Sequence, residues 1–143
     1  MNIFEAIAKS VDMCIAFNNI NTFHWSLPRQ SGVTTYFKTK INMDLLEGKK
    51  VAYVTFSKNA CNLMQKDIYK EYKGNFTCIH LTDEKQILGL KGTSLDRIYV
   101  DSICYAPKKL QNEFIASIIP VIASNPNAYL LWIDTSEGSL NGL

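Results

Sequence analysis

Two kinds of hydrophobic pattern alternate along this chain. Short, nearly continuous apolar runs lie at residues 22–27, 51–56, 76–81, 95–101 and 128–134. Longer segments, in which apolar residues recur every three or four positions, lie at residues 3–17, 34–46, 59–72 and 108–122. The short runs have the length of buried strands, and the longer segments have the spacing of helices that bury one face. The alternation predicts an α/β fold with a mostly parallel sheet and helices on both of its faces.

Small and polar residues mark where these elements begin and end. Ser57 is placed to cap the helix at 59–72, and Gly74 is placed to stop it. We expect Pro120 to kink or end the helix at 108–122, because proline has no N–H to donate inside a helix.

The composition is that of one globular domain spanning residues 1–143. Of these residues, 47% are hydrophobic and 20% are charged, which is enough apolar material for a sizeable core. The net charge of +2 neither supports nor excludes nucleic-acid binding. The four cysteines are too widely spaced for a zinc site, and we expect them to pack as small buried residues. No apolar run approaches the roughly 18 residues of a membrane span, so we expect a soluble protein with no membrane partner, located in the cytoplasm, or in the host cytoplasm if it is viral.

The segment at residues 27–35 has the features of a phosphate-binding loop. It follows a predicted strand and precedes a predicted helix, which is where backbone N–H groups and a helix N-terminus can receive an anion. In the pattern G-x-x-x-x-G-K-[ST], Gly32 fills the second glycine and Thr34 keeps the hydroxyl that binds Mg²⁺. Leu27 stands at the first glycine and Val33 replaces the lysine, so an ordinary turn before a helix is the alternative.

A second diagnostic residue is Asp101, which ends the strand at 95–101. In P-loop nucleotide hydrolases an aspartate at the carboxyl end of a strand beside the phosphate loop, the Walker B aspartate, orients Mg²⁺ and its waters. The alternative is a solvated turn acid that closes a buried strand. Thr34 and Asp101 are therefore the candidate metal ligands.

The order of these features resembles the ATPase domain of phage terminase large subunits, the motors that package viral DNA. The arginine-containing loop at 29–32 is similar to the loops of that family, and residues 91–101 are similar to its basic-glycine segment leading into the Walker B strand. The strand that ends near Thr135 resembles the family's coupling motif. The resemblance covers about residues 22–143 and implies a P-loop NTPase core of the ASCE, RecA-like type, preceded here by a helix at about 3–17.

The resemblance implies roles for individual residues, with ATP and Mg²⁺ as the expected cofactors. Arg29 would reach the phosphates in place of the missing lysine, Asp101 would position Mg²⁺, and Thr135 would couple hydrolysis to the movement of DNA. Glu137 lies just beyond the last strand, near the active edge of the sheet, and is the candidate to replace the family's water-orienting glutamate. The predicted phosphate-binding residues are Arg29, Gln30, Ser31, Gly32, Thr34 and Thr35.

Several departures from the family pattern indicate that ATP hydrolysis has been lost. Val33 cannot neutralise phosphate charge as a lysine does. The family's catalytic glutamate beside the Walker B aspartate is replaced by Ser102, and its adenine clamp has no counterpart near residues 9–10. The chain also ends where the family continues, so neither a nuclease domain nor a cutting activity is expected.

Three functions remain open on this evidence. The first is an active Mg-ATPase linked to viral DNA packaging. The second, which we prefer, is a pseudo-ATPase that binds nucleotide weakly and acts on a protein partner, either a phage packaging component or a host factor, because losing two groups that serve one transition state normally costs orders of magnitude in rate. The third is a module that binds nucleic acid, such as DNA, through lysines on one rim, for which a solvated surface is the alternative. These lysines are Lys38, Lys40, Lys49, Lys50, Lys108 and Lys109.

Overall fold

The computed structural model describes residues 2–18, 22–28, 31–68 and 70–136, with side chains described for all of these except 14–18 and 136. The elements in chain order are α1 (Ile3–Asn18), β1 (Thr22–Pro28), α2 (Val33–Leu46), β2 (Val51–Thr55), α3 (Lys58–Lys66), η1 (Lys70–Asn75), β3 (Phe76–His80), α4 (Glu84–Leu88), β4 (Arg97–Asp101), η2 (Ile103–Tyr105), α5 (Lys108–Ala123) and β5 (Tyr129–Ser136). Strands and helices alternate, as the hydrophobic pattern predicts.

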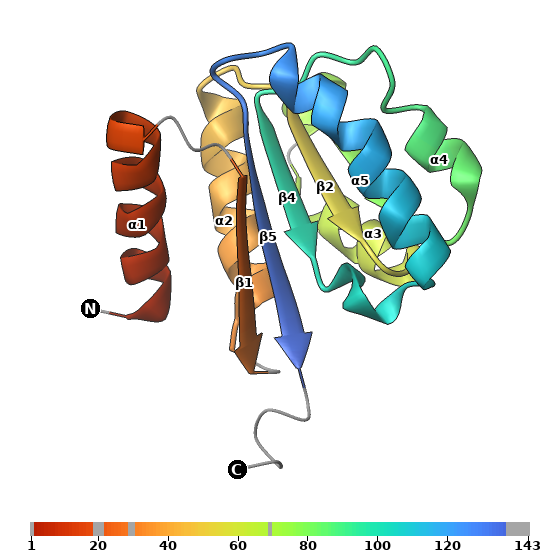
Figure 1. Ribbon diagram of the computed structural model, residues 1–143, viewed down its shortest axis with the longest axis horizontal. Coiled ribbons are helices and arrows are strands. Elements are labelled where there is room, and N and C mark those ends of the chain that lie inside the picture. Colours follow the sequence, from red (N-terminus) through yellow and green to blue (C-terminus); the bar gives the residue numbers. More distant parts are fainter. Residues whose placement is uncertain (1, 19–21, 29–30, 69, 137–143) are drawn as a thin grey trace.

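The described strands form one five-stranded sheet in the order β1-β5-β4-β2-β3, and every pairing is parallel. The labelled arrows in Figure 1 accordingly point the same way. β5 lies between β1 and β4, so the strand before the loop and the strand of Asp101 are second neighbours. The carboxyl ends of all three strands meet at one edge of the sheet.

Helices cover both faces of the sheet, which confirms the predicted architecture (Figure 1). On one face, α4 and α5 contribute residues such as Ile87 and Phe114 to a core with Val54 and Val100. On the other face, α1, α2 and α3 pack residues such as Ile7 and Phe37 into a second core. Within the described chain, no helix has both the length and the apolar character needed to cross a membrane.

The third helical segment departs from its prediction. α3 ends at Lys66 and a 3-10 helix follows from Lys70 to Asn75, whereas the spacing predicts one helix over 59–72. Cys61 and Met64 take the buried face of α3, and Leu63 is 53% exposed. The cap is as predicted, because the Ser57 hydroxyl accepts a hydrogen bond from the Ala60 N–H at 3.1 Å.

Of the two predicted effects of Pro120, a kink or an end of the helix, the end does not occur. α5 continues to Ala123 with Pro120 inside it. Proline cannot donate to the carbonyl four residues earlier, here that of Ala116. Pro120 lies on the exposed side of α5, where that carbonyl is not buried in the core, so the helix tolerates the missing bond.

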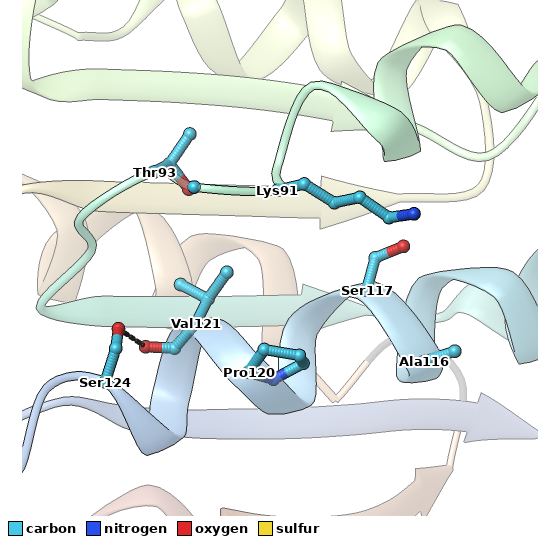
Figure 2. Close-up of a pocket in the computed structure, with 8 residues that line it drawn as sticks. Lys91, Thr93, Ala116, Ser117, Pro120, Val121 and Ser124 are labelled. Atoms are coloured by element: carbon cyan, nitrogen blue, oxygen red, sulfur yellow. Dashed lines mark hydrogen bonds between the residues drawn. The ribbon is translucent and has the colours of Figure 1, made fainter.

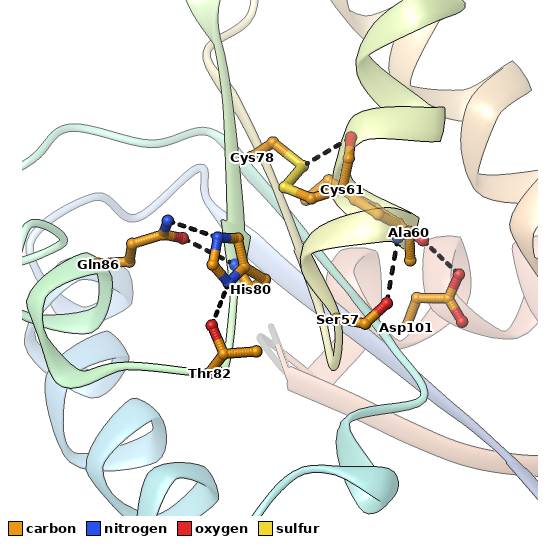
Figure 3. Close-up of a disulfide and its surroundings, with 9 residues drawn as sticks. Ser57, Ala60, Cys61, Cys78, His80, Thr82, Gln86 and Asp101 are labelled. Atoms are coloured by element: carbon orange, nitrogen blue, oxygen red, sulfur yellow. Dashed lines mark hydrogen bonds between the residues drawn. A yellow bond between two sulfur atoms is a disulfide. The ribbon is translucent and has the colours of Figure 1, made fainter.

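A disulfide joins α3 to β3, which corrects the expectation that the cysteines pack as separate thiols. Figure 3 shows Cys61 of α3 bonded to Cys78 of β3. The packing of α3 against β3 brings the two Cα atoms to 5.9 Å, within the range that a disulfide bridges. Cys104 is free and exposed.

A buried acid lies between α2 and the sheet. Asp44 is 5% exposed and accepts a hydrogen bond from the Tyr99 hydroxyl, which itself lies 3.2 Å from the Tyr129 hydroxyl. Burial raises the pKa of Asp44 above its ordinary value, against the smaller lowering effect of the Tyr99 hydrogen bond. The charged form of Asp44 therefore weakens the fold relative to the neutral form.

We predict that replacing both bridged cysteines, Cys61→Ala with Cys78→Ala, lowers the free energy of unfolding by about 3 kcal/mol, because the bridge closes a short loop in the unfolded chain. Denaturant titration measures the change. Cys104→Ala is the matched control and should leave stability nearly unchanged. Equal stability of the oxidised wild type and the double variant would contradict the prediction.

We predict that Asp44→Asn changes the pH dependence of stability. A carboxyl group whose folded pKa is raised stabilises the fold at low pH, and that contribution is lost as pH rises through the folded pKa. The variant lacks this loss, so its stability relative to wild type should increase as pH rises above about 4, the ordinary range of an aspartate. Tyr99→Phe, which removes the bond that favours the charged form, should steepen the loss. Denaturant titrations across this range would contradict the account if wild type and Asp44→Asn ran parallel.

Candidate phosphate site

The carboxyl edge of the sheet brings three predicted residues together. Asp101 is the last residue of β4, Thr135 lies near the end of β5, and Thr34 is the second residue of α2. All three line a cleft of about 330 Å³. Parallel strands place their carboxyl ends at the same edge, so residues far apart in the sequence meet there.

The described part of the loop leaves the start of α2 open to an anion. Gly32 precedes α2 in the left-handed conformation, with φ of 86°, which glycine adopts without steric cost. Because glycine has no side chain, the cap residue satisfies none of the N–H groups in the first turn. The Ser31 hydroxyl donates to the carbonyl of Pro28, the last residue of β1. The N-terminus of α2 thus directs partial positive charge toward the loop.

The Asp101 carboxylate accepts hydrogen bonds from three hydroxyl groups. Thr34 donates to Oδ2 at 2.8 Å, and Tyr53 of β2 donates to the same oxygen at 2.6 Å. Ser102 donates to Oδ1 at 2.9 Å. Asp101 is only 4% exposed, so these donors rather than bulk water stabilise its charge.

The hydroxyl of Thr135 extends this network. It lies 2.9 Å from the Ser102 oxygen. Since Ser102 uses its single proton on Asp101, Thr135 must be the donor in this contact. Each hydroxyl in this network therefore donates to the next residue, Thr135 to Ser102 and Ser102 to Asp101. The predicted coupling residue is linked to the predicted Walker B aspartate through one intervening side chain.

Tyr53 is a fixed donor in this network. Burial raises the pKa of its hydroxyl well above the ordinary value, and the charge of Asp101 and the hydrogen bond to it raise the pKa further. The phenol therefore keeps its proton at physiological pH. A buried tyrosine normally needs a partner for its hydroxyl, and here that partner is the site's carboxylate.

Ser102, at the position of the family's glutamate, has an unusual backbone. Its φ of 57° and ψ of 36° are left-handed, and it is the one non-glycine residue with positive φ in the described chain. That conformation costs roughly 1–2 kcal/mol for a residue with a side chain. The Ser102 N–H donates to the Ile133 carbonyl at 2.9 Å, and this bond and the hydroxyl network hold it in place.

The mouth of the cleft is apolar. Phe56, Leu63 and Tyr105 line it and are 37%, 53% and 46% exposed. The Phe56 and Tyr105 rings meet edge to face with centroids 5.4 Å apart, and the Tyr105 hydroxyl donates to the Thr135 carbonyl at 2.9 Å. The cleft thus has a hydroxyl-lined floor around one carboxylate and an apolar rim.

Val33 occupies the position of the missing lysine but does not face the cleft. Its side chain is 3% exposed and belongs to the core formed with α1, including Ile7. Phe4 of α1 lies close to the loop, because a Cβ on Gly32 would be 3.8 Å from its ring. The valine is a packing residue of the helix layer, so a lysine at this position would lose those apolar contacts.

The predicted site residues are only partly brought together. Arg29, Gln30 and Glu137 lie outside the described residues, so their roles stay predictions. Ser31, Gly32 and Thr35 lie in the loop and first turn of α2 but are not among the residues that line the cleft.

Sequence reasoning missed Tyr53 as a site residue. The available signal was a tyrosine within a strand predicted to be buried on both faces, because such a hydroxyl needs a partner. Sequence reasoning also treated Ser102 only as a lost glutamate. Its hydrogen bond to Asp101 follows from the left-handed turn after β4, which spacing does not reveal.

The predicted basic-glycine segment lies away from the cleft. Figure 2 shows Lys91 beside a second cavity of about 480 Å³, whose lining also includes Gly92 and the α5 residues Ser117 and Pro120. Residues 91 and 92 precede β4, whereas Asp101 ends it. In a parallel sheet these positions are at opposite ends of the strand. The segment therefore does not contribute to the floor of the phosphate site.

Two other groups of polar residues have structural roles. His80 accepts a hydrogen bond from the Gln86 amide at 2.7 Å, so its Nδ1 donates to the Thr82 hydroxyl at 2.6 Å (Figure 3). In the second group, the Asp134 carboxylate of β5 lies 2.8 Å from Nε2 of His24 on β1.

Cys104 is not activated as a nucleophile. Its partial burial, with the nearby Asp134, raises the pKa of the Cys104 thiol, the opposite of what a nucleophilic cysteine requires.

The predicted single rim of lysines is wrong. Lys49 and Lys50 precede β2 at the amino edge of the sheet, whereas Lys108 begins α5, after the carboxyl edge. Lys38 pairs with Asp67 at 2.6 Å, and Lys109 pairs with Glu84 at 3.1 Å. The charges are distributed over two ends of the molecule and are partly neutralised.

The hydroxyl donors around Asp101 leave little of its carboxylate for a tightly bound Mg²⁺. Among the described residues, no group of three or more His, Cys, Asp or Glu side chains is placed to hold a metal. Asp101 is the single carboxylate lining the described cleft, and three hydroxyl protons already point at it. A Mg²⁺ site normally offers open carboxylate oxygens to the ion or its waters.

We predict that Thr34→Val lowers the free energy of unfolding by about 1–3 kcal/mol, because the buried Asp101 carboxylate loses a donor. Thr35→Val is the matched control, since it makes the same change one residue later in the same helical turn and should shift stability by less than about 0.5 kcal/mol. Denaturant titration measures both variants, and equal losses would show that the Thr34 bond does not matter.

Comparison with known proteins identifies the fold. Neither a protein-family model nor a curated protein matches the sequence. Among solved structures, the chain is similar to an arginine-to-alanine mutant of the large terminase ATPase domain of Thermus phage P74-26, with a TM-score of 0.59 and 12% identity. The match covers 87% of this chain and 63% of that one, so the chain spans less than two thirds of the neighbour. With the all-parallel sheet, this likeness shows an α/β fold similar to that of a large terminase ATPase domain.

Proposed function

We propose that this protein is a terminase-like pseudo-ATPase, a P-loop domain that binds the phosphates of a nucleotide weakly, does not turn the nucleotide over, and acts through a protein partner. One observation carries the proposal. The two positions that supply charge and a base in the family hold Val33, buried in the core, and Ser102, committed as a donor to Asp101.

The remaining features support binding of phosphate without hydrolysis of the nucleotide. The start of α2 offers N–H groups and a partial positive charge to an anion, and the cleft beside it has room for a compact group. Loop residues Arg29 and Gln30 are the proposed side-chain contacts to phosphate, with Ser31, Gly32, Thr34 and Thr35 supplying hydroxyl or N–H groups. A serine that donates its proton to a carboxylate cannot also remove a proton from water.

An active Mg-ATPase is the second candidate, and the contact between Thr34 and Asp101 favours it. At 2.8 Å the hydroxyl donates to the carboxylate, which leaves the oxygen lone pairs of Thr34 free to face a cation. In this candidate Arg29 would neutralise phosphate charge and Glu137 would activate water. Thr135 would couple ATP hydrolysis to the movement of DNA, because it contacts Ser102 beside Asp101.

The structural neighbour supports a proposal for the partner and the setting. A large terminase ATPase domain is the part of a phage protein that this fold resembles, so we propose a phage origin and a role in the host cytoplasm beside DNA packaging components or a host factor. DNA remains a candidate ligand, to be tested by salt-sensitive retention on duplex DNA.

We predict that millimolar ATP raises the melting temperature, because a ligand that binds only the folded state stabilises it. Arg29→Ala should remove this rise. Phosphate release with ATP, Mg²⁺ and DNA should not exceed that of Arg29→Ala. Turnover of about 1 per second or faster, as in ordinary enzymes, would contradict the pseudo-ATPase proposal, and the absence of any thermal shift would contradict phosphate binding.

A further inference from the structure

The Asp101 carboxylate has little capacity left for a metal ion. A carboxylate offers about four lone-pair positions. Thr34 and Tyr53 both donate to Oδ2, and Ser102 donates to Oδ1. The described residues thus fill both positions on one oxygen and one on the other. A hydrated cation beside Thr34 would have to displace one of these protons or use the single remaining position.

Tyr53 is the donor that distinguishes this arrangement. The Thr34 bond joins the phosphate loop to the aspartate, and the Ser102 bond belongs to the turn after β4. Tyr53 comes instead from β2, a different strand, and makes the shortest of the three contacts, 2.6 Å. It is 1% exposed, and its ring contacts Phe37 of α2 edge to face at 6.3 Å. The phenol therefore cannot swing away from Asp101 without disrupting the core.

We propose that Tyr53 is a specificity-determining residue that makes phosphate binding at this site independent of divalent cations. Its hydroxyl takes the position on Asp101 that a metal-bound water would need. The three hydroxyl dipoles stabilise the carboxylate in place of a cation. The preferred ligand is then a metal-free nucleotide diphosphate or triphosphate. This inference rests on the proposed phosphate site, and it adds that the nucleotide binds there without a divalent cation.

The register of the sheet provides a matched control. Tyr53 of β2 pairs with Tyr99 of β4. Both rings are almost completely buried, and both hydroxyls donate to an aspartate, but Tyr99 donates to Asp44, which is not among the residues that line the cleft. Tyr53→Phe and Tyr99→Phe therefore remove one phenol oxygen each from equivalent positions, and only the first frees an oxygen of Asp101.

The test is calorimetric titration of ADP into the full chain with Mg²⁺ or with EDTA. Wild type should bind with affinities that agree within about threefold, and Tyr53→Phe should bind about tenfold more tightly with Mg²⁺ than with EDTA, the effect of one hydrogen bond to a charged group. Tyr99→Phe should behave as wild type. A wild-type affinity that rises tenfold with Mg²⁺, or a Tyr53→Phe variant without that gain, would overturn the proposal.

A titration of Mn²⁺ alone, followed by electron paramagnetic resonance, separates this inference from the proposed function. Tyr53→Phe should retain Mn²⁺ at least about fivefold more tightly than wild type and Tyr99→Phe. Equal retention by all three would overturn the role of Tyr53 whether or not nucleotide binds. If Tyr53→Phe does not fold, the wild-type comparison of ADP binding with Mg²⁺ and with EDTA still decides the proposal, because a tenfold rise with Mg²⁺ would overturn it. Phosphate release from ATP would contradict the pseudo-ATPase proposal alone.

Discussion

The bonds that hold the Asp101 carboxylate connect most of what organises this molecule. They join the loop helix α2, the strands β2 and β4 and, through Ser102, the strand β5. A buried carboxylate is costly without such partners, so the structure must either surround it with donors or leave it to a cation. In this chain the donors are hydroxyl groups of the protein. The same bonds that stabilise the carboxyl edge of the sheet thereby reduce what the edge can do as a metal site.

The layers of the fold place these groups and limit their chemistry. α1 packs beside α2, and the position that would carry a lysine contributes to the core between them. Gly32 is required instead by its left-handed backbone, with φ of 86°, since a side chain there would only touch the Phe4 ring at 3.8 Å. On the opposite wall of the cleft, α3 carries Ala60 and Leu63, and the disulfide next to them fixes this helix to β3. Both walls are therefore fixed by packing that has no catalytic role.

The sequence predicts the fold because several local patterns in it indicate the same strands and helices. Apolar runs such as 51–56 identify strands, and a strand-loop-helix order with Gly32 and Thr34 locates the loop. Asp101 was predictable as a site residue because the end of a buried strand in a parallel sheet lies at the active edge. Thr34 and Asp101, 67 residues apart, are in contact, and their joint role in a binding site stays a prediction.

Other features depended on contacts that periodicity does not encode. The end of α3 and the exposure of Leu63 reflect which face packs on β3, and the pairing of Cys61 with Cys78 follows from that packing. The buried Val33 is a further case. In a binding motif, an apolar residue is interpreted as the loss of the lysine, and only the structure shows that Val33 packs in the core with α1. Tyr53 was missed because its partner lies on another strand.

The central claim is that the site holds phosphate without hydrolysing it. Phosphorus nuclear magnetic resonance of ATP mixed with the protein in the presence of Mg²⁺ tests both halves in one sample. The account predicts that the phosphate resonances of ATP broaden as protein is added and that no resonance of inorganic phosphate grows with time. Unchanged line widths, or steady growth of the inorganic phosphate signal, would contradict it.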